Sequence, residues 1–403
     1  MSMARRDELA AVAVLSVCWA LALFDITGID YLMPFVAPNL KLNNTQIGLL
    51  FSLYYIPFGV SSYATGVLAD RFGKPRALLI SVMLAFSLAS VLPGLTASFT
   101  TLLITRLIMG VLGGPILPLA QTIVATDFPA ERRGTNMGIV QNVATSLLGF
   151  VTPILLVALA DRWSWRAGFF VIAVPGLIST ALIALTMRQI PVAATGANDN
   201  SQSPRHGQLV REVLRHRNVW LCIVGATLFT AFVLIGRGYL PLFLVQLRHM
   251  SAQRMGLLMS VLSVSGLILG IVFPALADRF GRKAAAITSC LLGAIFPLGA
   301  LYFSGPDAGL AVLMFIGWAP AGASILLFAT IPSETVPKGS ISTTIGLTFA
   351  IGTLVGGFLG PAVAGWSADR WGLQSSLLLQ AGCAIAMAMV CMGLRETRPA
   401  HSR

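Results

Sequence analysis

Long apolar runs flank the stretch Gly66-Val67-Leu68-Ala69-Asp70-Arg71-Phe72-Gly73-Lys74-Pro75-Arg76, and two more flank a similar stretch, Pro274-Ala275-Leu276-Ala277-Asp278-Arg279-Phe280-Gly281-Arg282-Lys283. Each stretch predicts a tight charged loop between two membrane helices on the same side of a bilayer. Asp70 and Asp278 are 208 residues apart, about half of the 403-residue chain. A repeat with this period, placed between apolar runs, is typical of transporters built from two pseudo-symmetric bundles.

The composition supports a membrane protein independently of the repeat. The chain is 56% hydrophobic and only 10% charged, which leaves too little polar surface to coat a soluble globule of this length. The formal net charge of +12 raises the question of nucleic acid, but the basic residues do not gather in one soluble patch. We therefore expect the lipid bilayer, and no nucleic acid, as a partner.

The apolar runs predict an all-α membrane protein with twelve transmembrane helices in two pseudo-symmetric six-helix bundles. We place an N-terminal bundle at 1–187, a polar cytoplasmic linker at 188–217 and a C-terminal bundle at 218–403. The expected helices are 9–35, 45–69, 77–96, 99–125, 134–160, 167–187, 218–246, 251–277, 284–304, 309–330, 340–365 and 373–394.

The distribution of basic residues predicts the orientation. Of the 27 Lys and Arg residues, two lie within spans and six in loops on one side, which leaves 19 on the side that holds both termini, the linker and the repeated loops. By the positive-inside rule, that side is cytoplasmic, and we expect a multi-pass protein of the plasma (inner) membrane. The six on the other side are Lys41, Arg162, Arg166, Arg248, Arg254 and Arg370.

The pattern G-x-L-[AG]-D-R-x-G-[RK]-x-[RK] after a second membrane helix resembles the signature of the major facilitator superfamily. The first copy matches closely, with Pro75 between its two basic residues, and the second has Pro274 where the family usually has Gly. The resemblance implies twelve helices, a monomer, no cofactor and a gating role for these loops. The gating residues that it implies are Asp70, Arg71, Gly73, Arg76, Asp278 and Arg279.

Four ionisable residues fall inside predicted spans: Asp25, Asp30, Arg106 and Arg237. A charge in hydrocarbon costs several kcal/mol, so such residues are functional candidates. At 1.5 Å rise per residue, Asp25, Arg106 and Arg237 each lie roughly 12–15 Å from the outer end of their helix and can share one layer. A structural ion pair is the alternative for the arginines, and a place near the interface is the alternative for Asp30.

Helices 1 and 4 carry partial resemblances to known branches of the superfamily. Asp25 and Asp30 flank Gly28, which is similar to the Asp-Gly-aromatic-Asp of aromatic-acid:proton symporters, although the spacing is five instead of three. A five-residue step turns about 140° on a helix, so Asp25 is the better central candidate for proton coupling. Arg106 precedes small residues, as in the family's helix-4 motif. We expect aromatic walls for the site among Tyr31, Tyr54, Tyr55, Phe243 and Trp318.

The sequence thus predicts a proton-coupled symporter of a small organic anion, a carboxylate above all, bound by Arg106 and Arg237 through their planar guanidinium groups. Proton-driven efflux of drugs or amphipathic lipids is the alternative, weakened because helix 5 lacks a Gly-Pro pair near Pro153. A non-transporting membrane receptor is the alternative from another class. No catalytic or metal-binding spacing lies within a span, so we expect neither an enzyme nor a metal site. Coupling to sodium, and the identity of the anion, stay open.

Overall fold

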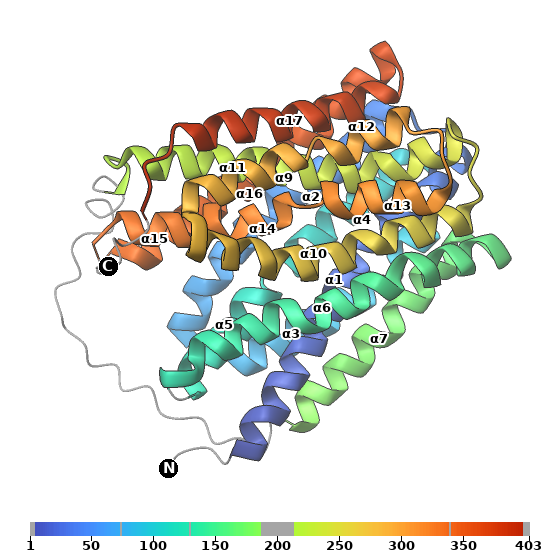
Figure 1. Ribbon diagram of the computed structural model, residues 1–403. Helices are drawn as coiled ribbons and strands as arrows, with labels where there is room; N and C mark the ends of the chain where they lie inside the picture. The colour runs from blue at the N-terminus through green and yellow to red at the C-terminus, as the bar shows by residue number, and fades with distance from the viewer. Residues whose placement is uncertain (1–4, 73–74, 129, 187–212, 338–339, 398–403) are drawn as a thin grey trace. The chain divides into compact units, whose positions relative to one another are not determined.

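The computed structural model describes residues 5–72, 75–128, 130–186, 213–337 and 340–397 (Figure 1). In these ranges the chain is helical and contains no β-strand. Twelve helical stretches are long and apolar enough to cross a membrane. The predicted all-α membrane architecture is confirmed, and the observed spans begin and end within a few residues of the predicted ones for most helices.

The chain divides into two compact units. Unit 1 comprises residues 1–42, 53–198 and 251–260, and unit 2 comprises residues 43–52, 199–250 and 261–403. The helices of the first sequence half are α1 (Arg5–Asn39), α2 (Asn44–Phe72), α3 (Pro75–Ala89), η1 (Leu92–Leu95), α4 (Phe99–Gly113), α5 (Ile116–Asp127), α6 (Ala130–Arg162) and α7 (Trp165–Thr186).

The second half follows a similar order. Its elements are α9 (Arg217–Gln246), α10 (Ala252–Phe280), α11 (Arg282–Leu292), α12 (Ile295–Tyr302), α13 (Asp307–Gly317), α14 (Pro320–Ile325), the π-helical turn η3 (Leu326–Thr330), α15 (Ile331–Thr335), α16 (Ile341–Trp371) and α17 (Gln374–Met392).

The internal repeat of the sequence reappears in the packing of each unit. In unit 1, α1 packs against α6 and α7; in unit 2, α9 packs against α16 and α17. These are the first, fifth and sixth spans of each half, so the two halves use the same contacts. Helix α16 continues to Trp371, beyond the predicted end at 365, and so places Arg370 in its last turn. Most of the predicted linker, residues 188–212, lies outside the described residues.

Three spans are interrupted at or shortly before a proline. The third span stops at Ala89 and resumes as η1, which contains Pro93. The fourth breaks before Pro115 and the tenth before Pro320. Proline has no N–H to donate and its ring clashes with the preceding turn, so a helix ends or kinks just before it. The break in the third span matters for the candidate site because Ser90 lies in it.

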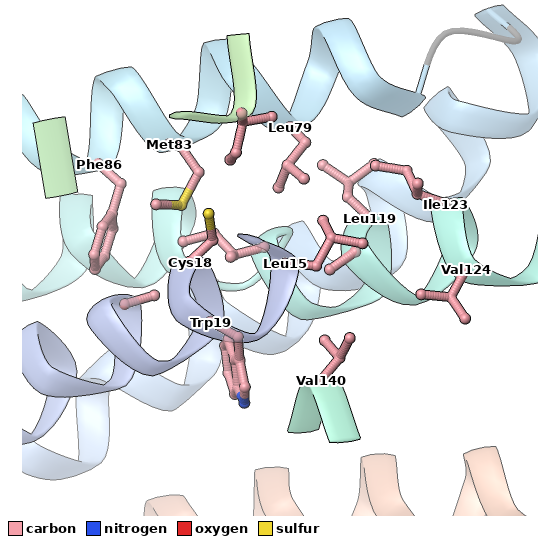
Figure 2. Close-up of a cluster of buried hydrophobic side chains, with 14 of the residues drawn as sticks. Leu15, Cys18, Trp19, Leu79, Met83, Phe86, Leu119, Ile123, Val124 and Val140 are labelled. Atoms are coloured by element: carbon pink, nitrogen blue, oxygen red, sulfur yellow. The ribbon is translucent and has the colours of Figure 1, made fainter. Parts of the chain in front are cut away.

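Figure 2 shows the buried cluster that holds α1, α3 and α5 together in unit 1. Leu15 and Cys18 of α1 meet Leu79 and Met83 of α3 and Leu119 of α5, all fully or almost fully buried. Lipid tails are as apolar as leucine, so transfer out of lipid stabilises this cluster little. Close van der Waals contact between interlocking side chains is what holds the helices in place.

The first turns of α2 and α10 are anchored by carboxylates that the repeat relates. Within unit 2, Asp369 accepts four hydrogen bonds from the backbone and side chains of Asn44 and Thr45, at 2.5–3.0 Å. Within unit 1, the side-chain amide of Gln253 donates to Asp161. Asp161 and Asp369 are 208 residues apart, and so are Thr45 and Gln253. The repeat is therefore preserved at the level of single contacts.

Candidate functional site

Asp25 lies deep inside unit 1, on the face of α1 that meets the end of α3. Its side chain is 2% exposed, and its Oδ2 accepts a hydrogen bond from the hydroxyl of Ser90. Its Oδ1 is buried and has no hydrogen-bond partner among the described residues. An unsatisfied buried carboxylate oxygen is costly, so it needs a nearby positive charge, a proton or a ligand.

The positive charge beside Asp25 comes from Arg106 on α4. Arg106 is 2% exposed, and its Nη2 donates at 3.3 Å to the carbonyl of Ile26, the residue that follows Asp25. The positive charge of Arg106 interacts electrostatically with the Asp25 carboxyl group. Its Nε and Nη1 are buried and have no hydrogen-bond partner within the described structure. A buried guanidinium with two unused donor atoms suits an anion, because charge-assisted hydrogen bonds are the strong ones.

Tyr54 of α2 covers the guanidinium. The Arg106 Cζ lies 4.9 Å from the centre of the Tyr54 ring, a cation–π distance, and the Tyr54 hydroxyl is a further buried group without a partner among the described residues. Gly110 of α4 and Gly114, which directly follows α4, make this close approach of α2 possible. A Cβ atom at Gly110 would lie 2.5 Å from the Tyr54 carbonyl oxygen, and a Cβ atom at Gly114 would lie 2.2 Å from the Phe58 carbonyl oxygen. The small residues after Arg106 therefore let α2 pack closely on α4.

The other predicted site residues fall into two groups. In unit 1, Asp30 and Tyr31 of α1 are 8% and 5% exposed, and Tyr55 stacks edge-on against Tyr54 with ring centroids 5.3 Å apart. Asp30, Tyr31 and Tyr55 each also take part in a further hydrogen bond, ion pair, ring contact or electrostatic interaction. The structure thus brings Asp25, Arg106 and Tyr54 together.

In unit 2, Arg237 lies on α9 and is partly buried, and Phe243 on the same helix is buried. Trp318, 8% exposed, stacks with Phe232 at 5.7 Å and with Phe296 at 5.6 Å between ring centroids. These contacts place the Trp318 ring in an aromatic cluster within unit 2.

The repeated loops are described in part. The side chains of Asp70 and Arg71, and the whole of Gly73, lie outside the described part of the structure, whereas Arg76 is partly buried at the start of α3. In the second copy, Asp278 accepts from Arg282, which also binds Glu334 at 2.9 Å. Arg279 covers the ring of Phe280, with its Cζ 5.4 Å from the ring centre.

Two features of unit 1 were missed by reasoning from the sequence. Ser90 is fully buried against Asp25, and the only signal for it is a serine just before Pro93-Gly94 in an apolar span. Glu8 is 3% exposed and pairs with Arg132 at 2.9 Å and with the Asn136 amide at 2.8 Å. It lies one residue before the first expected helix, 9–35, so it was not counted among the ionisable residues inside spans.

Among the described residues, no group of three or more His, Cys, Asp or Glu side chains could hold a metal ion. The cysteines are all free thiols, and four of the five are buried. They are Cys18, Cys222, Cys290, Cys383 and Cys391.

Known proteins are similar to this chain in sequence and in fold. A hexuronate transporter of Bacillus subtilis (strain 168) is 24% identical over 98% of this chain and 96% of its own length. The probable sulfoacetate transporter SauU of Cupriavidus necator is 23% identical over 90% and 87%. A solved bacterial homologue of the human lysosomal transporter Spinster, inward-facing and unoccupied, has a TM-score of 0.75 at 18% identity, covering 97% of this chain and 96% of that one.

The family model named Major Facilitator Superfamily matches residues 15–358, which include the two repeated loops, Asp25 and Arg106. The fold and the sequence relatives agree with this match. The chain therefore belongs to the Major Facilitator Superfamily, and it is a multi-pass membrane transporter and not an enzyme.

Proposed function

We propose that this transporter carries a small organic anion with a carboxylate group and couples its movement to protons by symport. The observation that carries the proposal is the state of Arg106: a fully buried guanidinium that donates to one neutral backbone carbonyl while its Nε and Nη1 have no hydrogen-bond partner in the described structure. A carboxylate can supply the missing acceptors and the missing negative charge together.

The relatives support an anionic substrate. The names of the two relatives described above specify a hexuronate and sulfoacetate, and both molecules carry a carboxylate. Arg237 is a second proposed anion-binding residue, because its expected depth in the seventh span is similar to that of Arg106 in the fourth. The aromatic residues beside Arg106 in unit 1, Tyr54 and Tyr55, are proposed to line the same site.

Asp25 is the proposed proton carrier, with Asp30 as a secondary candidate. When Asp25 is ionised, it competes with the substrate anion for the field of Arg106; when it is protonated, Arg106 is left to the substrate. An anion bound to Arg106 in turn neutralises part of the field that acts on Asp25. Substrate and proton therefore assist each other's binding, which is the reciprocity that symport requires.

The repeated loops are proposed to gate the transport path. We place them and both termini on the cytoplasmic side of the plasma (inner) membrane, because the positive-inside rule assigns that side to most Lys and Arg residues. Asp70 is proposed to stabilise one of the two access states by accepting hydrogen bonds from unpaired backbone N–H groups at a helix N-terminus. Asp70→Asn should change the distribution of spin-label distances across that side, and an unchanged distribution would refute the gating role.

Thermal stabilisation of the purified protein by a ligand panel tests the proposed substrate class. We expect D-glucuronate or sulfoacetate to raise the melting temperature, and D-glucose, a neutral molecule similar in size to glucuronate, to leave it unchanged. Arg106→Lys should remove the stabilisation by anions. Stabilisation by glucose or by a hydrophobic cation, with none by carboxylates, would overturn the proposed substrate class. Stabilisation by the cation would favour the efflux alternative.

A further inference from the structure

The Ser90 hydroxyl lies between two acceptors that compete for it. Its Oγ is within hydrogen-bond reach of the Asp25 Oδ2 and lies 2.9 Å from the backbone carbonyl oxygen of Phe86. Ser90 is fully buried. A hydroxyl carries a single proton, so Ser90 can donate to only one of the two at a time, while its lone pairs can accept from a donor. Whether Asp25 is ionised or protonated determines which of these hydrogen bonds Ser90 makes.

Ser90 directly follows the end of α3, so a change in its hydrogen bonds affects the last turn of that helix. Helix α3 ends at Ala89, and the next helical element, η1, begins at Leu92. The Ser90 backbone N–H donates to the same Phe86 carbonyl, at 2.9 Å. The hydrogen bonds of this residue therefore close the last turn of α3 immediately before the break in the third span.

Asp25 interacts electrostatically with groups on two other helices. Arg106 of α4 and the Tyr54 phenol of α2 interact with it electrostatically. Helices α6 and α7 pack against α1, but their described charged side chains lie at helix ends. Arg132 pairs there with Glu8, Asp161 with Gln253, and Arg166 with Asn39 and Thr96, while Arg162 follows Asp161. On α5, the side chain of Asp127 is not described. On α1 itself, Asp30 lies five residues away.

We propose that Ser90 is the positioning residue for proton coupling: it donates to ionised Asp25, and it accepts from protonated Asp25 while turning its own proton to the Phe86 carbonyl. The inference rests on the proposed role of Asp25 as proton carrier. The one bond that forms is the O–H bond of the proton that Asp25 binds, while the Ser90 O–H bond stays intact and only rotates. Protonation is thereby converted into a change of hydrogen bonding at the break in the third span.

This assignment predicts which protonation state Ser90 favours. Ionised Asp25 has one hydrogen-bond donor, Ser90, among the described residues, and hydrogen bonds to charged groups are stronger than those to neutral ones. Removal of the hydroxyl therefore costs the ionised form more than the protonated form. In Ser90→Ala, Asp25 should take up its proton at a pH about one unit higher, a tenfold change in proton affinity.

Infrared difference spectroscopy on the purified full-length protein, titrated with acid, tests this without a substrate. The C=O stretch of a protonated carboxyl that is absent in Asp25→Asn identifies Asp25. In Ser90→Ala, its titration midpoint should rise by about one pH unit, and the band should move to higher frequency because the carboxyl O–H has lost its acceptor. Ser90→Thr keeps a hydroxyl and should restore the wild-type midpoint, and it covers the case in which Ser90→Ala does not fold.

Ser87→Ala is the matched control. Ser87 is also buried, lies one turn earlier on α3, and donates to the carbonyl four residues back, that of Met83, at 2.7 Å. It should leave both the midpoint and the band unchanged. If the Asp25 band titrates but Ser90→Ala matches the wild type, the role of Ser90 is refuted and proton coupling stands. If no band is lost in Asp25→Asn, the assignment of Asp25 as proton carrier fails, and the role of Ser90 fails with it.

Discussion

Asp369 and Thr45 share two hydrogen bonds: the Thr45 backbone N–H and hydroxyl both donate to the Asp369 Oδ2, at 2.8 and 2.5 Å. The other carboxylate oxygen accepts from the Asn44 backbone and amide, at 2.9 and 3.0 Å. Asp369 thus satisfies backbone N–H groups at the start of α2, where the helix dipole also favours a negative charge. A residue near the end of the eleventh span fixes the beginning of the second.

Asp369→Asn should therefore lower the stability of the protein. The amide has no charge and a single acceptor oxygen, so part of the capping interaction is lost, at a cost of about 1 kcal/mol. The measurement is the melting temperature of the purified protein in detergent. Asp161→Asn, the repeat-related change, should have the smaller effect because Asp161 accepts from a side-chain amide. Equal melting temperatures for wild type and Asp369→Asn would show that the contact does not anchor α2.

Gly110→Ala should separate α4 from α2. The new Cβ would lie 2.5 Å from the Tyr54 carbonyl oxygen, a backbone atom that cannot move without shifting the helix. We expect a lower melting temperature and a weaker response to anions, since the Tyr54 ring and Arg106 are displaced from each other.

Gly346→Ala is the control for this change, because nothing lies within 4 Å of the position of its added Cβ. It should be neutral or slightly stabilising, given the higher helix propensity of alanine. A Gly110→Ala protein as stable and as responsive as Gly346→Ala would contradict the close packing of the two helices.

Arg106→Lys should weaken anion binding at least tenfold although the charge is kept. Lysine lacks the planar set of donors and cannot keep the contact with the Ile26 carbonyl and bind a carboxylate in the same geometry. Arg237→Lys should weaken binding as well, as proposed for the second arginine. Isothermal titration with the stabilising anion measures both.

Arg166→Lys is the matched control for these arginine changes. Arg166 also covers an aromatic ring, that of Trp165, with its Cζ 4.2 Å from the ring centre, but it lies at the start of α7 outside the proposed site. It should leave the affinity unchanged. Wild-type affinity in Arg106→Lys would assign a structural role to Arg106.

The sequence predicted the fold well because the spans follow from hydrophobic length and the two halves from a repeated loop. It also identified Asp25 and Arg106 as candidates, since charges in apolar spans are costly and rare. Their common location in unit 1 is what the structure adds: Arg106 reaches the carbonyl of the residue next to Asp25.

Other features were beyond the reach of sequence patterns. Serine is common in membrane helices, and the nearby Pro93-Gly94 is a weak signal for Ser90 over Ser87. Only the structure shows that Ser90, just after α3 ends at Ala89, contacts Asp25. The contact of Asp369 with Asn44 and Thr45 joins residues more than 300 positions apart, and helix periodicity carries no information about such pairs.

Proton-driven accumulation of the substrate anion in proteoliposomes tests the central claim most directly. The anion that best stabilises the purified protein is supplied in radiolabelled form, with and without an imposed proton gradient. Asp25→Asn resembles the permanently protonated state, so it should still exchange labelled for unlabelled anion across the membrane while failing to accumulate it, and Asp30→Asn should have the smaller effect. Accumulation by Asp25→Asn at the wild-type level would contradict the account and pass the coupling role to Asp30 or to an ion other than the proton.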